Sequence, residues 1–142
     1  VIGDGPYKNQ LENKVKDLGL AKYVKLYGQM SHNEVLQTLL QGSIGLAIYS
    51  NLQSWTYYGD SVKAREYVGC GIPVIMNMDI SPANELIENN CGFIANTKDD
   101  LETILYKLML DDELYKRIRA NAVNMAKQMK WSRYYGIITK LQ

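Results

Sequence analysis

Apolar residues recur along this chain with two different spacings, and the alternation between them predicts short strands separated by helices. Spacing of i, i+4 and i+7 marks a first helix from about Lys8 to Leu18, with Gly19 as its stop. Ser31-x-x-Glu34 predicts a capping box at the start of a second helix. Short apolar runs predict strands, and the continuous run at 44–49 is typical of a strand buried on both faces. The predicted strands are residues 1–2, 23–27, 44–49, 74–75 and 92–95, with further helices at about 62–69 and 84–88.

Strands separated by helices of about ten residues indicate a doubly wound, Rossmann-like α/β fold, with a parallel sheet and helices on both faces. Beyond residue 96 the pattern is helical only. Two apolar stripes are present there, and a final helical segment covers 131–141. The stripes are Leu101, Ile104, Leu105 and Leu108, and then Leu114, Ile118, Ala122 and Met125. We therefore expect a single domain over residues 1–142 with a helical C-terminus.

Composition narrows the class of protein without deciding its function. The chain is 46% hydrophobic and 22% charged, which is ordinary for a soluble globular domain. A formal net charge of +1 argues against a dedicated nucleic-acid binder. Two cysteines, Cys70 and Cys91, give no disulfide framework and favour a reducing, cytoplasmic compartment.

The C-terminal segment 114–142 is basic, contains no Asp or Glu, and includes Trp131, Tyr134 and Tyr135. Such a segment can rest on an anionic membrane surface, which would make the protein peripheral to the inner face of the membrane. A solvated helix face whose aromatic residues pack onto the domain explains the same pattern and is favoured.

The chemistry of the chain is concentrated between residues 58 and 75. A loop ending at Ser61 opens a helix that carries Lys63 and Glu66, so backbone amides and a cation meet at a helix N-terminus, where a phosphate ester can bind. The amides of Ser61 and Val62, with Lys63, could face a diphosphate, and Glu66 could accept hydrogen bonds from a ribose diol. The alternative is a surface ion pair between Lys63 and Glu66, worth only about 0.2–0.5 kcal/mol.

Other candidate positions are less specific. Gly3-Asp4-Gly5-Pro6 lies between a strand and a helix, at the sheet edge where ligands bind in open α/β folds, but a tight turn needs glycines anyway. His32 falls in the first turn of a helix, usually a solvated position. Acidic pairs at 99–100 and 111–112 are typical of helix starts, and no zinc-ligand set is present in the sequence. No metal or other cofactor is expected.

These segments, in this order, resemble the C-terminal half of a family-4 (group 1) glycosyltransferase with the two-domain GT-B fold. The resemblance covers nearly the whole chain. The matching segments are VIGDGP at 1–6, VKLYGQMSHNEV at 24–35, IGLAIYS at 44–50, SVKAREYVGCGIPVI at 61–75 and SPANELI at 81–87.

The resemblance implies the nucleotide-sugar-binding domain of a retaining glycosyltransferase. Such an enzyme moves a sugar from a UDP- or GDP-sugar to an acceptor hydroxyl, here in the synthesis of a surface polysaccharide such as a capsule. The family's first strand and its N-terminal acceptor domain would precede Val1. We therefore expect the 142 residues alone to bind nucleotide weakly and to be inactive.

The resemblance also assigns site residues, although it leaves the catalytic group unknown. The predicted nucleotide contacts are Gly3, Gly5, Gly28, Gln29, Met30, Ser61, Val62, Lys63 and Glu66. The residues predicted near the donor sugar are Tyr58, Gly59, Asp60, Ser81 and Glu85. Tyr58 stands where many members have a glutamate that touches the sugar. Two alternatives stay open: a non-catalytic nucleotide-sugar-binding module, which Tyr58 favours, and a GT-B-type epimerase of the same architecture.

Overall fold

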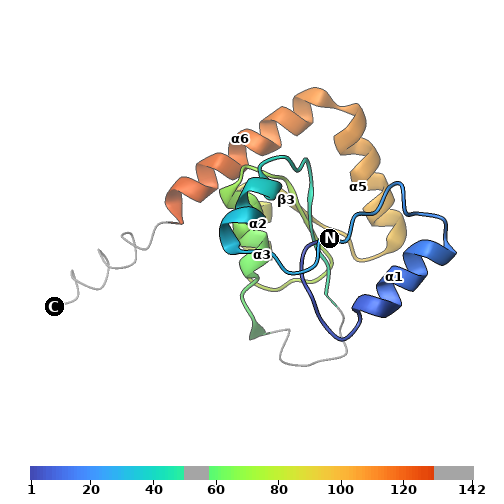
Figure 1. Ribbon diagram of the computed structural model, residues 1–142. Helices are drawn as coiled ribbons and strands as arrows, with labels where there is room; N and C mark the ends of the chain where they lie inside the picture. Colours follow the sequence, from blue (N-terminus) through green and yellow to red (C-terminus); the bar gives the residue numbers. More distant parts are fainter. Residues whose placement is uncertain (50–57, 130–142) are drawn as a thin grey trace. The chain divides into compact units, whose positions relative to one another are not determined.

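The computed structural model describes residues 1–49 and 58–129 of the chain (Figure 1). They belong to two compact units, residues 1–38 and 39–142, and each is described by itself. None of the helices in the described ranges is long and apolar enough to cross a membrane. The predicted helix at 131–141 lies outside the described residues.

The first unit is built around α1 (Lys8–Asp17). The helix ends as predicted, with Leu18 as its C-cap and Gly19 in the left-handed region at a φ of 66°. The i, i+4, i+7 spacing of its apolar residues is typical of a buried stripe, but here the stripe is not buried, since Leu11 is 39% and Leu18 60% exposed. A unit this small has little apolar surface with which to cover a helix.

Two extended segments of the first unit lie side by side. The Tyr27 amide donates to the Val1 carbonyl at 2.9 Å, and the Gly3 amide donates to the Gly28 carbonyl at 2.8 Å. No regular strand forms within residues 1–38, so the strands predicted at 1–2 and 23–27 are wrong. Gly3 and Gly28 have φ values of 127° and 70°, outside the β region, and this ends the ladder after a few bonds.

The helix α2 (His32–Leu39) begins with the predicted capping box. The Ser31 amide donates to the Glu34 carboxylate at 2.8 Å, and the Glu34 amide donates to the Ser31 hydroxyl at 3.4 Å. The Ser31 hydroxyl also donates to the Glu34 carboxylate at 2.6 Å, and this bond, followed by the bond from the Ser31 amide, lowers the pKa of Glu34 below its usual value. His32, the first residue of the helix, is exposed.

The second unit contains a three-stranded parallel sheet in the order β1 (Gly45–Ala47), β2 (Val74–Met76) and β3 (Gly92–Ile94). Its helices are α3 (Val62–Gly69), α4 (Ala83–Glu88), α5 (Lys98–Leu110) and α6 (Asp112–Gln128). The predicted burial of both faces at 44–49 is wrong, since Leu46 is 44% and Ile48 45% exposed. β1 is an edge strand of this sheet, so fewer neighbours cover it than cover the central strand.

The central strand β2 is buried along its whole length and divides the core into two sides. Val74 and Met76 pack on one side with residues of α3, α4 and α6, whereas Ile75 packs on the other with Leu108 and Ile118. This is the alternation expected of a strand with period two. Helices on both faces of a parallel sheet are therefore confirmed.

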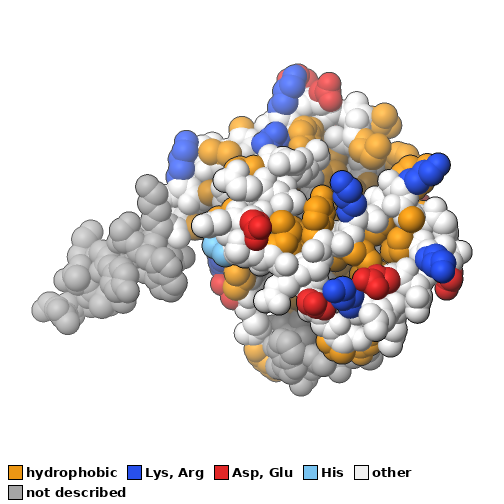
Figure 2. Space-filling model, viewed as in Figure 1, with side chains coloured by type: hydrophobic (Ala, Val, Ile, Leu, Met, Phe, Trp, Pro, Cys, Tyr) orange, Lys and Arg blue, Asp and Glu red, His pale blue; other side chains and the backbone are white. Residues whose placement is uncertain are grey.

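The last two helices start at their acidic pairs, as predicted. Thr97 and Asp100 form a capping box at α5, and the Asp111 carboxylate accepts from the Leu114 amide at 2.8 Å at α6. Both predicted stripes face the core, where Leu108, Ile118, Ala122 and Met125 are buried. Acidic and basic side chains are mixed with hydrophobic ones on the face in Figure 2, in keeping with the near-neutral net charge.

Candidate functional site

The N-cap of α3 is Ser61, which is 3% exposed and in an extended conformation. Its hydroxyl accepts from the Ala64 amide at 3.2 Å, and its own amide donates to the Ser81 carbonyl at 2.8 Å. The first amides of a helix have no intrahelical acceptor. The prediction that the Ser61 amide faces a diphosphate is therefore wrong, since that amide is taken by Ser81. The Val62 and Lys63 amides have no such acceptor among the described residues and are the pair left to bind a ligand at this N-terminus.

Tyr49 organises this helix start, although the sequence reasoning did not select it. Its phenol is hydrogen-bonded to the Ser61 hydroxyl at 2.5 Å, and the Lys63 ammonium lies 4.2 Å from the centre of its ring. The Asn77 side chain holds the Tyr49 backbone, accepting from its amide at 2.8 Å and donating to its carbonyl at 2.7 Å. Tyr49 and Asn77 each follow a strand at its carboxyl end, and this position was the signal that could have found them.

Glu66 lies half-buried in the second turn of α3. Burial raises the pKa of the Cys70 thiol, and the negative charge of Glu66 adds to that increase. Ala64 and Val68 are fully buried and Tyr67 is half-buried, so these three residues form the side of the helix that faces the core. The role of Glu66 toward a ribose stays a prediction.

The residues predicted near a donor sugar are brought together only in part. Asp60 and Ser81 form an isolated parallel bridge, and the Ser81 hydroxyl donates to the Asp60 carboxylate at 3.0 Å. Glu85, in α4, joins them through the guanidinium of Arg65 at 3.1 Å. Tyr58 is 92% exposed and does not join this cluster.

Arg65 lowers the pKa of one carboxyl in the cluster. Burial alone would raise the pKa of Asp60. Hydrogen bonds from Arg65 and Ser81, together with the guanidinium charge, bring it below its usual value. Asp60 is therefore ionised at neutral pH. Both carboxylates of this cluster face the protein's own cation.

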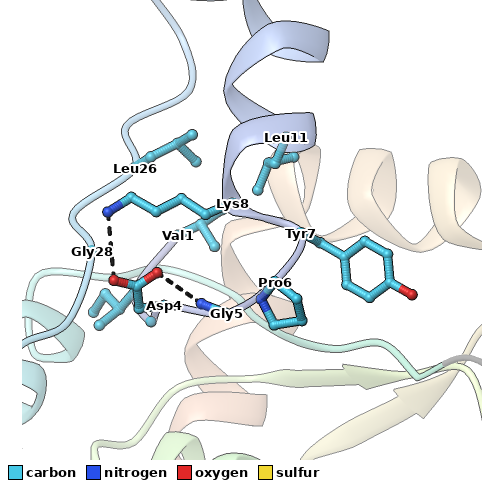
Figure 3. A pocket seen from close by; sticks show the side chains of 11 residues that line it. Val1, Asp4, Gly5, Pro6, Tyr7, Lys8, Leu11, Leu26 and Gly28 are labelled. Atoms are coloured by element: carbon cyan, nitrogen blue, oxygen red, sulfur yellow. Dashed lines mark hydrogen bonds and ion pairs between the residues drawn. The ribbon is translucent and has the colours of Figure 1, made fainter.

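In the first unit, the predicted glycines surround a pocket of about 410 Å³ (Figure 3). Gly3, Gly5 and Gly28 line it, whereas Gln29 and Met30 do not. Across its rim, the Lys8 ammonium and the Asp4 carboxylate form an ion pair at 3.5 Å. The other Asp4 oxygen accepts from the Gly5 amide at 2.8 Å, which fixes the turn.

The same pocket exposes backbone rather than side chains along the glycine turn. A Cβ added to Gly3 or Gly5 would meet no heavy atom within 4 Å beyond the neighbouring residues of the chain, so their side of the pocket is open space that a ligand could occupy. The Tyr7 ring points away from the Asp4–Lys8 pair, and Leu11 and Leu26 supply apolar walls (Figure 3). A partly apolar group would suit this lining.

A family model for the C-terminal domain of glucosyltransferase 3-like proteins matches residues 7–139. The chain belongs to this family. An uncharacterized glycosyltransferase of Methanocaldococcus jannaschii is 27% identical over 135 residues, which are 94% of this chain and 36% of that protein. The chain thus spans about a third of the curated relative that it matches.

Two solved structures share the fold of this Gtf3-like domain. HepE from Anabaena, crystallised with UDP, superimposes with a TM-score of 0.79 at 21% identity, over 99% of this chain and 39% of HepE. WaaG, a glycosyltransferase involved in lipopolysaccharide biosynthesis, gives a TM-score of 0.74 at 20% identity, over 92% of this chain and 34% of WaaG. The predicted fold, the C-terminal half of a GT-B glycosyltransferase, is confirmed.

Proposed function

We propose that this Gtf3-like domain binds the nucleotide-sugar donor of a longer retaining glycosyltransferase. The reaction would move a glycosyl group from a UDP- or GDP-sugar to an acceptor hydroxyl, in surface polysaccharide synthesis on the cytoplasmic side of the membrane. HepE was crystallised with UDP and WaaG acts in lipopolysaccharide biosynthesis, and both support this direction. The chain covers 36% of its curated relative, which leaves room there for a separate acceptor domain.

The observation that carries the proposal is the set of hydrogen-bond donors and positive charges at the N-terminus of α3. The Val62 and Lys63 amides, the positive end of the helix and the Lys63 ammonium together present donors to an anion. The Tyr49 ring holds that ammonium without cancelling its charge, because a π face carries only a partial negative charge. A diphosphate supplies the several anionic oxygens that this arrangement can bind.

In the parent enzyme these groups would act on the leaving group. When the bond from sugar to diphosphate breaks, negative charge accumulates on the diphosphate, and fixed amides and a cation stabilise that charge without a metal. Glu66 would hold the ribose. The glycine-lined pocket of the first unit, taken by itself, suits a partly apolar group such as a nucleobase. Tyr58 offers no carboxylate to the sugar, so a non-catalytic nucleotide-sugar-binding module is the second candidate.

The test is a calorimetric titration of the 142-residue chain with UDP, GDP, UDP-glucose and GDP-mannose. Variants Glu66→Gln and Lys63→Met should each weaken nucleotide binding about tenfold or more, a change that corresponds to about 1.4 kcal/mol. Matched controls are Glu102→Gln and Lys98→Met, which make the same charge changes in α5 at exposed side chains. The controls should bind as the wild-type chain does.

The outcomes separate the alternatives. Wild-type affinity in Glu66→Gln refutes the ribose role, and wild-type affinity in Lys63→Met refutes the diphosphate role. Absence of binding for all four ligands refutes the donor-binding function of this chain. If the parent enzyme binds donor but transfers no sugar to any hydroxyl acceptor, the non-catalytic module is the better description.

A further inference from the structure

Arg65 lies at the centre of a polar cluster that joins two loops of the second unit. Its Nε donates to both Asp60 carboxylate oxygens at 2.9 and 2.7 Å. Its Nη2 donates to Glu85 at 3.1 Å and to the Ser81 hydroxyl at 3.2 Å, and its Nη1 donates to Glu85 at 3.4 Å. Asp60 comes from the loop before α3, Ser81 from the loop after β2, and Glu85 from α4.

The number of these bonds shows that Arg65 binds other groups of the protein and is not left open for a ligand. A guanidinium has five N–H groups, and the bonds to Asp60, Ser81 and Glu85 use all but one of them. The side chain is also only 25% exposed. An arginine that is this fully engaged has little capacity left for a phosphate.

The net charge of the cluster also argues against a phosphate ligand at Arg65. Two carboxylates face one guanidinium, so the cluster is net negative and does not attract a diphosphate. This contrasts with Lys63 on the same helix, whose ammonium lies against an aromatic ring, a partner with no net charge. Two cations of one helix are thus used in different ways.

The cluster lies at the point where α3 begins. Asp60 directly precedes the N-cap Ser61, whose amide donates to the Ser81 carbonyl at 2.8 Å. Arg65 lies one helical turn into α3. It donates hydrogen bonds to Asp60, the residue before the cap, and to Ser81, which lies opposite the cap. Because long helical side chains extend toward the N-terminus, the guanidinium is directed back over this first turn.

We propose that Arg65 is a positioning residue, which acts through Asp60 and Ser81 to hold the first turn of α3 and its free amides in a nucleotide-binding geometry. The proposal rests on the donor-binding function proposed above. It assigns Arg65 no contact with the donor. Without the guanidinium, Asp60 and Glu85 repel each other, and the loops before α3 and α4 separate.

The experiment measures UDP affinity by calorimetry and the free energy of unfolding by urea denaturation for each variant. Arg65→Met should weaken UDP binding about tenfold, and Arg65→Lys should recover part of the loss, because an ammonium can hold one carboxylate but cannot span both loops. The matched control is Arg119→Met. Arg119 donates to the Gly71 carbonyl at 3.0 Å, beyond the opposite end of α3, so this variant should change stability and leave UDP affinity unchanged.

A further variant separates positioning from general stability. The triple change Arg65→Met, Asp60→Asn, Glu85→Gln removes the repulsion, so it should regain stability while UDP affinity stays low. If affinity returns together with stability, or if Arg119→Met weakens UDP binding equally, Arg65 is only structural and the proposal is overturned.

The remaining outcomes are also decisive. Wild-type UDP affinity in Arg65→Met overturns the proposal and leaves the donor-binding function intact. Failure of the wild-type chain to bind UDP or GDP refutes the donor-binding function, and the positioning role falls with it. If Arg65→Met does not fold, Arg65→Lys is compared with Arg119→Lys by the same criteria.

Discussion

Replacing Ser61 by Ala removes two interactions at once from the start of α3. The hydroxyl caps the helix by accepting from the Ala64 amide at 3.2 Å, and it is the partner of the Tyr49 phenol at 2.5 Å. The residue is 3% exposed, so water cannot take its place without disturbing the packing. Both interactions therefore contribute to the free energy of unfolding.

The magnitude follows from these two losses. A serine N-cap contributes about 1 kcal/mol relative to alanine. A hydroxyl left without its partner in a partly buried place costs roughly 1 kcal/mol more. We expect Ser61→Ala to cost about 2 kcal/mol in total. Thr97→Ala at α5 should cost only about 1 kcal/mol, because the Thr97 cap is exposed and water can replace its hydroxyl at the Asp100 amide and carboxylate.

The assay is urea denaturation followed by far-UV circular dichroism, applied as a double-mutant cycle. Tyr49→Phe should cost about 1 kcal/mol, because it removes the same hydrogen bond from the other side. The double variant should then cost about 2 rather than 3 kcal/mol, a coupling of about 1 kcal/mol. Additive effects within about 0.3 kcal/mol, or a Ser61→Ala cost no larger than that of Thr97→Ala, would refute the reasoning.

Three further predictions concern the second unit, residues 39–142, to which Ser61 also belongs. Gly45→Ala should destabilise the fold by about 1–3 kcal/mol in urea denaturation, because a Cβ there would overlap the Tyr67 ring; an unchanged midpoint would contradict this. Asp60→Asn should cost stability near neutral pH, and the cost should vanish in acid. The folded-state pKa of Asp60 is lowered, so its contribution to the free energy of unfolding is present above the usual aspartate pKa and is lost as pH falls through the lowered value. A cost of Asp60→Asn that grows in acid would contradict this direction. At pH 8 the buried Cys91, whose pKa burial raises to about 11, should resist iodoacetamide until the chain unfolds, whereas the half-buried Cys70 should react first; mass spectrometry of the peptides decides the order.

The helical part of the fold could be predicted from sequence because its signals are local. The stripe containing Ile118, Ala122 and Met125 faces the core, and the helix starts predicted from Ser31 and from the acidic pairs at 99–100 and 111–112 are found there. Each of these features depends on neighbours within a few positions along the chain. Tertiary packing did not override them.

The strands were less predictable, because a strand exists only through its partner. The run at 44–49 is apolar throughout, yet its exposure depends on what lies beside β1, which no local pattern reports. Residues 25–28 likewise find a partner at 1–3, but the positive φ of Gly28 ends the pairing. The predicted strand already ended before that glycine, but no local pattern showed that the pairing would be too short to form a regular strand.

The candidate site likewise has a part that local sequence signals predict and a part that depends on long-range contacts. Ser61, Val62 and Lys63 lie at a helix N-terminus, because capping residues and helix starts are local signals. Tyr49 and Asn77 are 28 positions apart and became part of the site only through strand pairing. Residues that meet through such long-range contacts have no fixed spacing in the sequence, so no motif predicts them.

The use of two different cations on α3 is a consequence of their chemistry. The cluster around Asp60 and Glu85 needs donors in a fixed plane that can bond two loops together, and only arginine supplies this fork. The position over Tyr49 needs a compact charge on a flexible stem that can leave the ring for an anion, and lysine has these properties. Exchanging the two residue types would leave the net charge of the helix unchanged, but neither requirement would be met. The order of Lys63 and Arg65 along α3 is therefore more informative about the site than the charge that they share.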